Sequence, residues 1–241
     1  MKRIAFGIAF GIALFAAAAF GAPVQEFSTS AGALKLTPIQ HASLMIQAGG
    51  KVLYLDPAMG SFDGMPQADY ILITDIHGDH MSPDNVNKLK KSGTEIVAPQ
   101  AVADKIAGAT VIGYGQSKKI GPFGVEAVPA YNLKRGPAEG KLFHDKGRGV
   151  GYILTYGGKR FYFSGDTEAI PEMKALKNID VAFVCMNLPY TMTPEEAAEA
   201  VRAFHPAVVY PYHYQGSDTA AFKKALEGTG IDVRLLDWYG K

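Results

Sequence analysis

The sequence predicts an α/β protein in which two mixed β-sheets pack face to face, with helices on their outer sides. Short apolar runs alternate with polar turns from about residue 30 onward, and four modest helical segments are interleaved with them. The chain has 241 residues, of which 48% are hydrophobic, and this is ample for a large core. No repeat, charged tail or low-complexity linker divides it, so one folded domain is expected.

Eight apolar segments have the length and composition of β-strands. They are residues 42–47, 51–55, 70–74, 123–129, 150–156, 159–164, 180–185 and 207–210. The first two are separated by Ala48-Gly49-Gly50, and a similar break follows Tyr156. Both breaks predict tight hairpin turns, because glycine tolerates the positive φ angles that such turns need.

Four segments are predicted to be helical, residues 83–91, 100–107, 194–204 and 219–227. The third has a clear start, because Thr193 can cap it, Pro194 takes the first position and two glutamates follow. Between the strands, residues 131–149 form a long loop with several glycines. Long loops in compact domains are often functional, so this one is a candidate lid or substrate wall.

The first 21 residues have the pattern of a secretory signal peptide. Lys2 and Arg3 precede an uncharged apolar run over residues 4–20, and Ala19-Phe20-Gly21 offers small residues for cleavage before Ala22. The alternative is an uncleaved membrane anchor, since the run could nearly span a bilayer. The favoured prediction is cleavage and export to a bacterial periplasm or beyond, which leaves no membrane span in the mature chain.

Charge and cysteine content exclude two other classes. The formal charge is +1, and it falls to about −1 once Lys2 and Arg3 are removed, so nothing favours nucleic acid as a partner. Cys185 is the only cysteine, so no intramolecular disulfide can form. It lies in an apolar strand segment, where a free cysteine behaves as a small hydrophobic residue rather than a ligand or nucleophile.

The most informative segment is Thr74-Asp75-Ile76-His77-Gly78-Asp79-His80, which holds four potential metal ligands. It follows the apolar run 70–73 and precedes Ser82-Pro83, a typical helix start, so the ligands lie on a short loop between a strand and a helix. Imidazole nitrogens together with carboxylate oxygens suit zinc, iron or manganese.

This loop resembles the metal-binding signature H-x-H-x-D-H of the metallo-β-lactamase superfamily. Later motifs agree in order and spacing over roughly residues 32–237: Gly165-Asp166 and Pro211-Tyr212-His213 follow apolar strands, and Asp56 closes an early one. The resemblance implies an αββα four-layer sandwich, with residues 22–241 as a metallo-hydrolase domain. It also implies one or two divalent metal ions (Zn, Mn or Fe) at one edge, between the sheets.

The resemblance assigns ligands to two metal pockets. Asp79, His80 and His213 would bind the second metal, and Asp166 falls where the family has a carboxylate that bridges two ions. In the family a metal-bound hydroxide is the nucleophile, because a metal lowers the pKa of its water.

The first pocket departs from the family pattern. Asp75 replaces the usual first histidine beside His77, and Asn132 best fits the place of the third histidine. This oxygen-rich set would shift metal preference from zinc toward manganese, iron or magnesium, and would leave one tightly held ion in the second pocket. His144, in the long loop, could complete the depleted pocket, contact substrate or donate a proton. Arg148 is assigned a structural role in preference to anion binding.

Three short sequence motifs resemble one branch of the superfamily in particular. They are His41-Ala42-Ser43, residues 190–194 and residues 211–214. That branch includes an ascorbate-6-phosphate lactonase, uncharacterised metal-dependent hydrolases and a phospholipase D acting on N-acyl-phosphatidylethanolamine. True lactamases lack a histidine directly after the motif aspartate, so antibiotic hydrolysis is a poor interpretation.

The predicted function is therefore that of an exported metal-dependent hydrolase acting on a small-molecule ester, lactone or phosphodiester. Asp79 and His144 are the candidate catalytic residues, and Tyr131 is an alternative to His144 for stabilising the oxyanion or protonating the leaving group. A non-catalytic binding module with a degenerate first pocket is the competing interpretation. The oligomeric state is left open.

Overall fold

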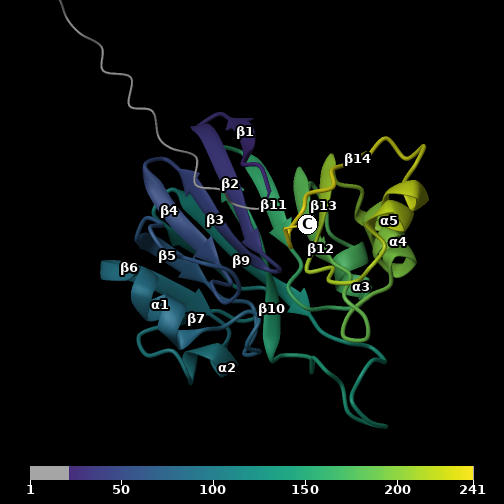
Figure 1. Cartoon of the computed structure of the whole chain (residues 1–241), viewed down its shortest axis with the longest axis horizontal. Coiled ribbons are helices and arrows are strands. Elements are labelled where there is room, and N and C mark those ends of the chain that lie inside the picture. Colours follow the sequence, from purple (N-terminus) through teal and green to yellow (C-terminus); the bar gives the residue numbers. More distant parts are fainter. Residues whose placement is uncertain (1–21, 241) are drawn as a thin grey trace, which may run out of the picture.

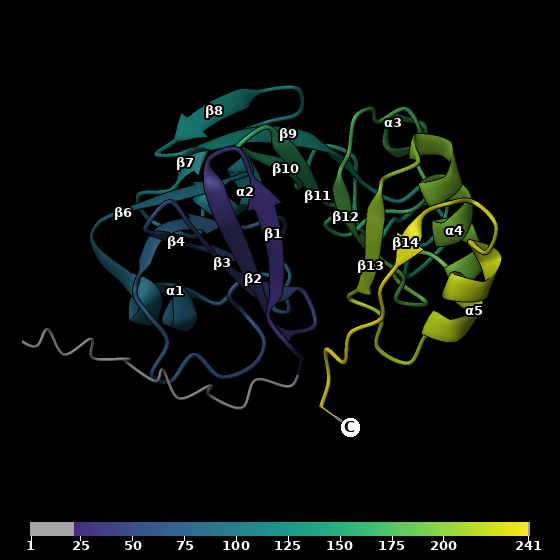
Figure 2. The same ribbon diagram turned by 90° about the horizontal axis from the view of Figure 1, so that it is seen from above.

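A computed structural model describes residues 22–240. Two seven-stranded sheets face each other, and helices cover the outer side of each, which confirms the predicted four-layer sandwich (Figure 1). Viewed from above in Figure 2, the first sheet lies on the left, and the second sheet runs from β8 at the top to β14 on the right.

The first sheet is formed by the N-terminal half of the chain. Its strands run in chain order: β1 (Gln25–Thr29), β2 (Gly32–Gln40), β3 (Ser43–Ala48), β4 (Lys51–Leu55), β5 (Ala68–Leu72), β6 (Lys90–Ala98) and β7 (Thr110–Val111). Pairing is antiparallel from β1 to β4 and parallel from β4 to β7.

The second sheet repeats this plan with the C-terminal half. Its strands are β8 (Ser117–Ile120), β9 (Phe123–Ala130), β10 (Gly149–Tyr156), β11 (Lys159–Phe163), β12 (Val181–Cys185), β13 (Val208–Tyr212) and β14 (Asp232–Val233). Pairing is antiparallel from β8 to β11 and parallel from β11 to β14. Each half therefore consists of a meander followed by parallel strands with crossover connections.

Five helices cover the parallel strands. They are α1 (Pro83–Leu89) and α2 (Gln100–Ala103) on the first sheet, and α3 (Pro171–Lys174), α4 (Pro194–Phe204) and α5 (Thr219–Ala225) on the second (Figure 1). Helix α4 has the predicted bounds and begins with a capping box between Thr193 and Glu196. Helix α2 ends at Ala103, four residues before the predicted end, and the chain continues in turns.

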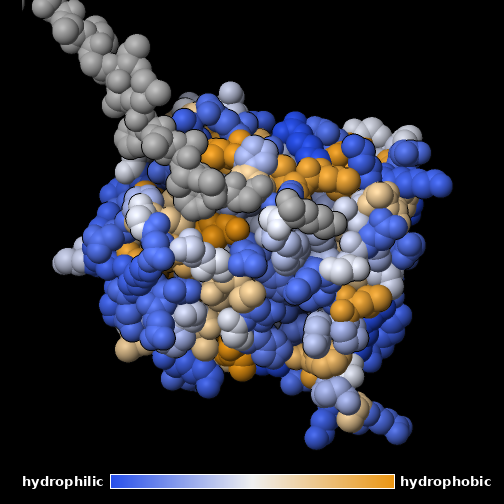
Figure 3. Space-filling view, in the orientation of Figure 1, coloured by the Kyte–Doolittle hydropathy of each residue, from blue (hydrophilic) through white to orange (hydrophobic). Residues whose placement is uncertain are grey.

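The core lies chiefly between the two sheets, where both contribute buried aromatic and aliphatic residues. Phe27 of β1 packs edge-on against Phe161 of β11 at 5.4 Å between ring centroids, so the halves are joined through side chains. A smaller apolar cluster lies under α1 and α2. The face seen in Figure 3 is mainly hydrophilic, with hydrophobic residues in small groups.

All eight predicted strands are present, with ends shifted by at most a few residues. Both predicted hairpin turns are confirmed, and Gly49, Gly50, Gly157 and Gly158 all have positive φ. Strands β1, β2, β6, β7, β8 and β14 and helix α3 were not predicted. Strand β6 shows why, because its first residues are charged or small (KKSGTE) and carry no apolar pattern.

The signal-peptide prediction concerns residues 1–21, which lie outside the described part of the chain. Within residues 22–240 no helix is both long and apolar enough to cross a membrane.

Candidate metal centre

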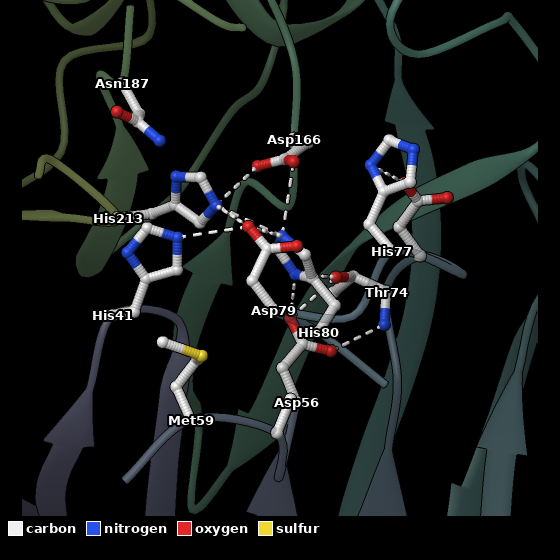
Figure 4. Close-up of polar contacts among 12 residues, drawn as sticks. His41, Asp56, Met59, Thr74, His77, Asp79, His80, Asp166, Asn187 and His213 are labelled. Atoms are coloured by element: carbon white, nitrogen blue, oxygen red, sulfur yellow. Dashed lines mark hydrogen bonds and ion pairs between the residues drawn. The ribbon is translucent and has the colours of Figure 1, made fainter. Parts of the chain in front are cut away.

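The predicted ligands meet at one edge of the sandwich, where strands of both sheets end. The loop after β5 carries Asp75 to His80, whereas Asp166 follows β11 and His213 follows β13. Since parallel strands end at the same edge of a sheet, the crossover connections place these loops side by side. Figure 4 shows the side chains pointing toward one another from the two sheets.

The second pocket brings together all four residues predicted for it. One ligand atom each of Asp79, His80, Asp166 and His213 lies within 4.8 Å of the others. His80 Nε2 is 3.2 Å from His213 Nε2 and 3.2 Å from Asp166 Oδ2. His213 Nε2 is 3.3 Å from Asp79 Oδ2. His80, Asp166 and His213 are buried, while Asp79 is 35% exposed and reaches the surface of a cavity.

The donor set of this pocket fits a divalent cation. His80 uses Nδ1 to bond Asp56 at 2.8 Å, so Nε2 is the nitrogen left to bind a metal, and it faces His213 Nε2. Asp166 Oδ1 is buried and accepts no hydrogen bond among the described residues, while His213 Nε2 lies 3.2 Å from it. Two imidazole nitrogens beside a buried carboxylate oxygen that lacks a hydrogen bond are an arrangement that a metal ion stabilises.

The electrostatics of the pocket keep its carboxylates ionised. Burial works against the charged form of Asp166, but the charges of His213 and His80 outweigh it and hold the pKa of Asp166 well below its usual range. Burial also opposes the ionisation of Asp79, but hydrogen bonds from His213 and His41 bring its pKa far below the ordinary value. The pKa of His80 is well above 6.5, because Asp166 and Asp56 outweigh its burial. The metal-free pocket therefore attracts cations.

Asp56 orients the metal loop. It is completely buried, and Oδ1 accepts a hydrogen bond from the Thr74 amide at 2.7 Å. Oδ2 accepts from Thr74 Oγ1 at 2.6 Å and is also the partner of His80 Nδ1. Such a carboxylate–histidine contact fixes the ring orientation and makes the metal-binding nitrogen more basic.

His41 and Tyr239 support Asp79 from the other side. His41 Nε2 is 3.2 Å from Asp79 Oδ2, and its Nδ1 is 2.6 Å from Tyr239 Oη. The His41 and His213 rings are 3.7 Å apart between centroids, with their planes tilted by 40°. His41 thus lies beside the ligands and on the cavity wall. Tyr239 was not predicted, because 198 positions separate it from His41 and no local motif marks it.

Three residues of this site have left-handed backbone conformations, with φ of 59° at His41, 44° at Asp56 and 46° at His213. Five non-glycine residues among the described ones have positive φ, so the site holds most of them. The His213 amide also donates to the His41 carbonyl at 3.1 Å, which joins the two sheets at the ligands. Concentrated backbone strain of this kind is characteristic of functional sites.

The first pocket consists of Asp75, His77, His144 and Asp166, again with one ligand atom of each within 4.8 Å of the others. His144 Nε2 is 2.9 Å from Asp166 Oδ2, and the His77 and His144 rings are 5.1 Å apart. Asp166 belongs to both pockets, which is the geometry of a bridging carboxylate.

Asn132 lies behind His144 and does not face the pocket. Its Oδ1 is 2.5 Å from His144 Nδ1, and its Nδ2 donates to the Tyr190 carbonyl at 2.8 Å. Both ends of the amide are therefore occupied by protein groups. We accordingly replace Asn132 with His144 as the proposed ligand, and Asn132 becomes the group that orients it. The first pocket then holds two carboxylates and two imidazoles, so it is not the oxygen-rich site that the sequence predicted.

Glu168 holds the base of the long loop in place. This buried carboxylate accepts hydrogen bonds from three consecutive amides, those of Leu133, Lys134 and Arg135, at 2.9–3.1 Å. No local motif indicates this role. The loop also brings Phe143 and His144 to the cavity, as expected of a substrate wall.

Two other residues considered from the sequence, Tyr131 and Cys185, lie away from the cavity lining. Tyr131 donates from its hydroxyl to Glu172 at 2.9 Å. Cys185 is fully buried in β12, and burial raises the pKa of its thiol to about 11. This places Cys185 in the core, as predicted.

A cavity of about 460 Å³ opens onto both pockets. It is lined by His41, Met59, His77, Gly78, Asp79, Phe143, His144, Asp166, Asn187, Tyr190, His213 and Gln215. The size suits a small molecule. Polar ligands at the base and Met59, Phe143 and Tyr190 on the walls allow a substrate with both polar and apolar parts.

Comparison with known proteins agrees with this site. Residues 35–213 match the family described as the beta-lactamase superfamily domain. A metal-dependent hydrolase of the UPF0173 group from Thermococcus onnurineus is 33% identical over 227 residues, covering 84% of this chain and 96% of that protein. A similar hydrolase from Desulforamulus reducens is 31% identical over 84% of this chain and 96% of its own.

Solved structures show the same fold. A protein from Parabacteroides distasonis, described as a metal-dependent hydrolase, has a TM-score of 0.84 and 42% identity, covering 89% of this chain and 98% of that one. The metallo-hydrolase Igni18 from Ignicoccus hospitalis has a TM-score of 0.68 at 24% identity, covering 84% and 94% of the two chains. With its paired His/Asp pockets, the chain belongs to the beta-lactamase superfamily, among its metal-dependent hydrolases.

Proposed function

We propose that this protein hydrolyses an ester, a lactone or a phosphodiester of a small molecule. The observation that carries this proposal is the convergence of two His/Asp pockets on one carboxylate at the base of a cavity. A divalent ion bound there supplies an activated water and a positive charge for the developing oxyanion.

The protein groups divide the remaining work. Asp79, partly exposed at the cavity base, orients the attacking water, and Asp166 holds the two pockets in register. His144 lines the cavity, with Nδ1 held by Asn132 and Nε2 2.9 Å from Asp166 Oδ2. When no ion occupies the first pocket, His144 Nε2 would have to exchange this contact for the leaving oxygen in order to protonate it. Binding His144 to a metal and using it as an acid are alternatives.

A substrate panel tests the proposal. Metal-free protein is reconstituted with zinc, manganese or iron and assayed on p-nitrophenyl esters, aliphatic lactones and bis(p-nitrophenyl) phosphate. We expect turnover on at least one class that disappears in Asp166→Asn and is kept in Cys185→Ser, a change in the core away from the cavity. Metal-loaded protein that binds a ligand but turns over none of the three classes would favour the alternative, a binding module.

Export is a second part of the proposal, and it rests on the pattern of residues 1–21. A full-length chain with a C-terminal tag, expressed in a Gram-negative host, should appear in the periplasm with Ala22 as its first residue. Recovery of an uncut chain from the membrane fraction would instead support the anchor.

A further inference from the structure

We propose that Arg148 is a built-in cation of the first pocket, which makes this pocket bind metal far more weakly than the second. The inference rests on the proposed function, because it concerns the same site. On this proposal, the Arg148 side chain determines whether the centre binds one metal ion or two.

Arg148 occupies both oxygens of Asp75. Its Nε donates to Oδ1 at 3.0 Å and its Nη2 to Oδ2 at 2.8 Å, a forked pair. The Asp75 side chain is 3% exposed and that of Arg148 is 19% exposed, so water screens the pair weakly. A bidentate guanidinium–carboxylate pair is among the strongest polar contacts in proteins.

The same guanidinium also faces the second ligand of the pocket. Arg148 Nη2 is 3.3 Å from His77 Nε2, and His77 Nδ1 is 3.2 Å from Asp75 Oδ2. Two of the four potential ligands thus direct their donor atoms at a fixed positive charge. An ion entering here must displace the guanidinium or accept its repulsion.

The fold holds Arg148 in this place. Gly149 begins β10, and a Cβ there would lie 3.1 Å from the Thr74 carbonyl and 3.2 Å from Asp75 Oδ1. The lack of a side chain lets β10 approach the metal loop, and the Val150 amide donates to the Thr74 carbonyl at 2.9 Å. The position of Arg148 therefore follows from the strand that pairs beside the site.

The second pocket has no such competitor. Within residues 22–240, the ion pairs of Asp79 and Asp166 are formed with histidines only. An imidazole can itself bind a metal through a ring nitrogen, whereas a guanidinium keeps its positive charge at any physiological pH. The two pockets should therefore fill one after the other.

Metal titration of purified protein tests this directly. Chelator-treated wild type, Arg148→Met and Arg160→Met are titrated with Zn²⁺ and Mn²⁺ by calorimetry, and bound metal is counted by mass spectrometry after gel filtration. Arg160→Met is the matched control, because it removes a forked arginine–carboxylate pair, with Glu126, outside the site.

We expect one tightly bound ion per chain for wild type and for Arg160→Met. Arg148→Met should retain two ions, with the weaker event strengthened at least about tenfold, because the repulsive charge is gone. Arg148→Lys keeps the charge and should behave more like wild type than like Arg148→Met.

Two wild-type ions of equal affinity, or an Arg148→Met titration identical to wild type, would overturn the inference and leave the hydrolase proposal intact. Failure of wild type to bind either metal would instead overturn the proposed function. If Arg148→Met does not fold, Arg148→Gln, which removes the charge and keeps a polar side chain, takes its place and should likewise retain two ions.

Discussion

The two pockets have the same ligand inventory and different surroundings. Each has two aspartates and two histidines, and they share Asp166. In the second pocket His80 is fully buried and held by Asp56, whereas in the first His77 is 40% exposed and faces Arg148. A list of ligands would call the sites equivalent, but burial, supporting contacts and nearby charge indicate that they are not.

Removing one imidazole from each pocket in turn should give the largest difference in the affinity of the tightly bound ion. His80→Gln is expected to weaken the tight ion by at least about a hundredfold, because it removes both the ligand and its contact to Asp56. His77→Gln should leave the tight ion nearly unchanged. Calorimetric titration with Zn²⁺ measures both variants. Equal losses in the two would mean that the pockets act as one unit.

Metal removal should lower thermal stability through the second pocket. Free metal at about 100 times its Kd stabilises a protein by about 2.7 kcal/mol. For a chain of this size that corresponds to a fall in Tm of roughly 5–10 °C on chelation. Calorimetric melting of wild type and of His77→Gln with and without chelator should show the same shift, and His80→Gln should show almost none. A shift that survives in His80→Gln would place the stabilising ion elsewhere.

Mutation of the residues that orient the ligands should change metal affinity less than loss of a ligand does, and each change should affect one pocket only. Asp56→Asn weakens the contact to His80 and should reduce the affinity of the tight ion about tenfold to a hundredfold. Asn132→Ala releases His144 and should affect only the weaker event, by a similar or smaller factor. Zn²⁺ competition against a fluorescent chelator resolves these changes. Loss of the tight ion in Asn132→Ala would return Asn132 to a role at the second pocket.

The number of protons released on metal binding should show the smallest difference between the two pockets. The pKa of His80 is raised well above 6.5 by Asp166 and Asp56, so the metal-free protein carries a proton there at pH 7, and binding must expel it. The pKa of His77 is lowered by burial, so His77 is neutral and releases none. Calorimetry in buffers of different ionisation enthalpy should give about one proton for the tight ion. A value near zero would contradict the assignment.

The four residues predicted for the second pocket lie together, whereas those predicted for the first do so only in part. Asp166 and His213 come within three residues of a strand end, and Asp79 and His80 lie on the loop between β5 and α1, so the topology of the sheets brings them together. His144 lies 14 positions beyond β9, in a loop whose path depends on the buried contacts of Glu168. For that reason Asn132, which follows the strand closely, was given the place that His144 takes. The pairing of Arg148 with Asp75 spans 73 positions and leaves no local pattern.

The fold, like the site, was predicted only in part. Strands with a continuous apolar face were predicted, while β6, which lies between β5 and β7, and the edge strand β8 were not. Charged residues interrupt both strands and leave no hydrophobic period. Helix α3 has only four residues and is too short to show a helical repeat.

The repeated plan of the two sheets has a consequence for how the centre is held. Each pocket takes two ligands from the N-terminal half and two from the C-terminal half: Asp75 and His77 with His144 and Asp166, and Asp79 and His80 with Asp166 and His213. A bound ion would therefore cross-link the two halves of the sandwich. Because its ligands come from both halves, its affinity depends on how well the two sheets pack together. A cavity made at the Phe27–Phe161 contact would therefore lower the metal affinity without changing a ligand.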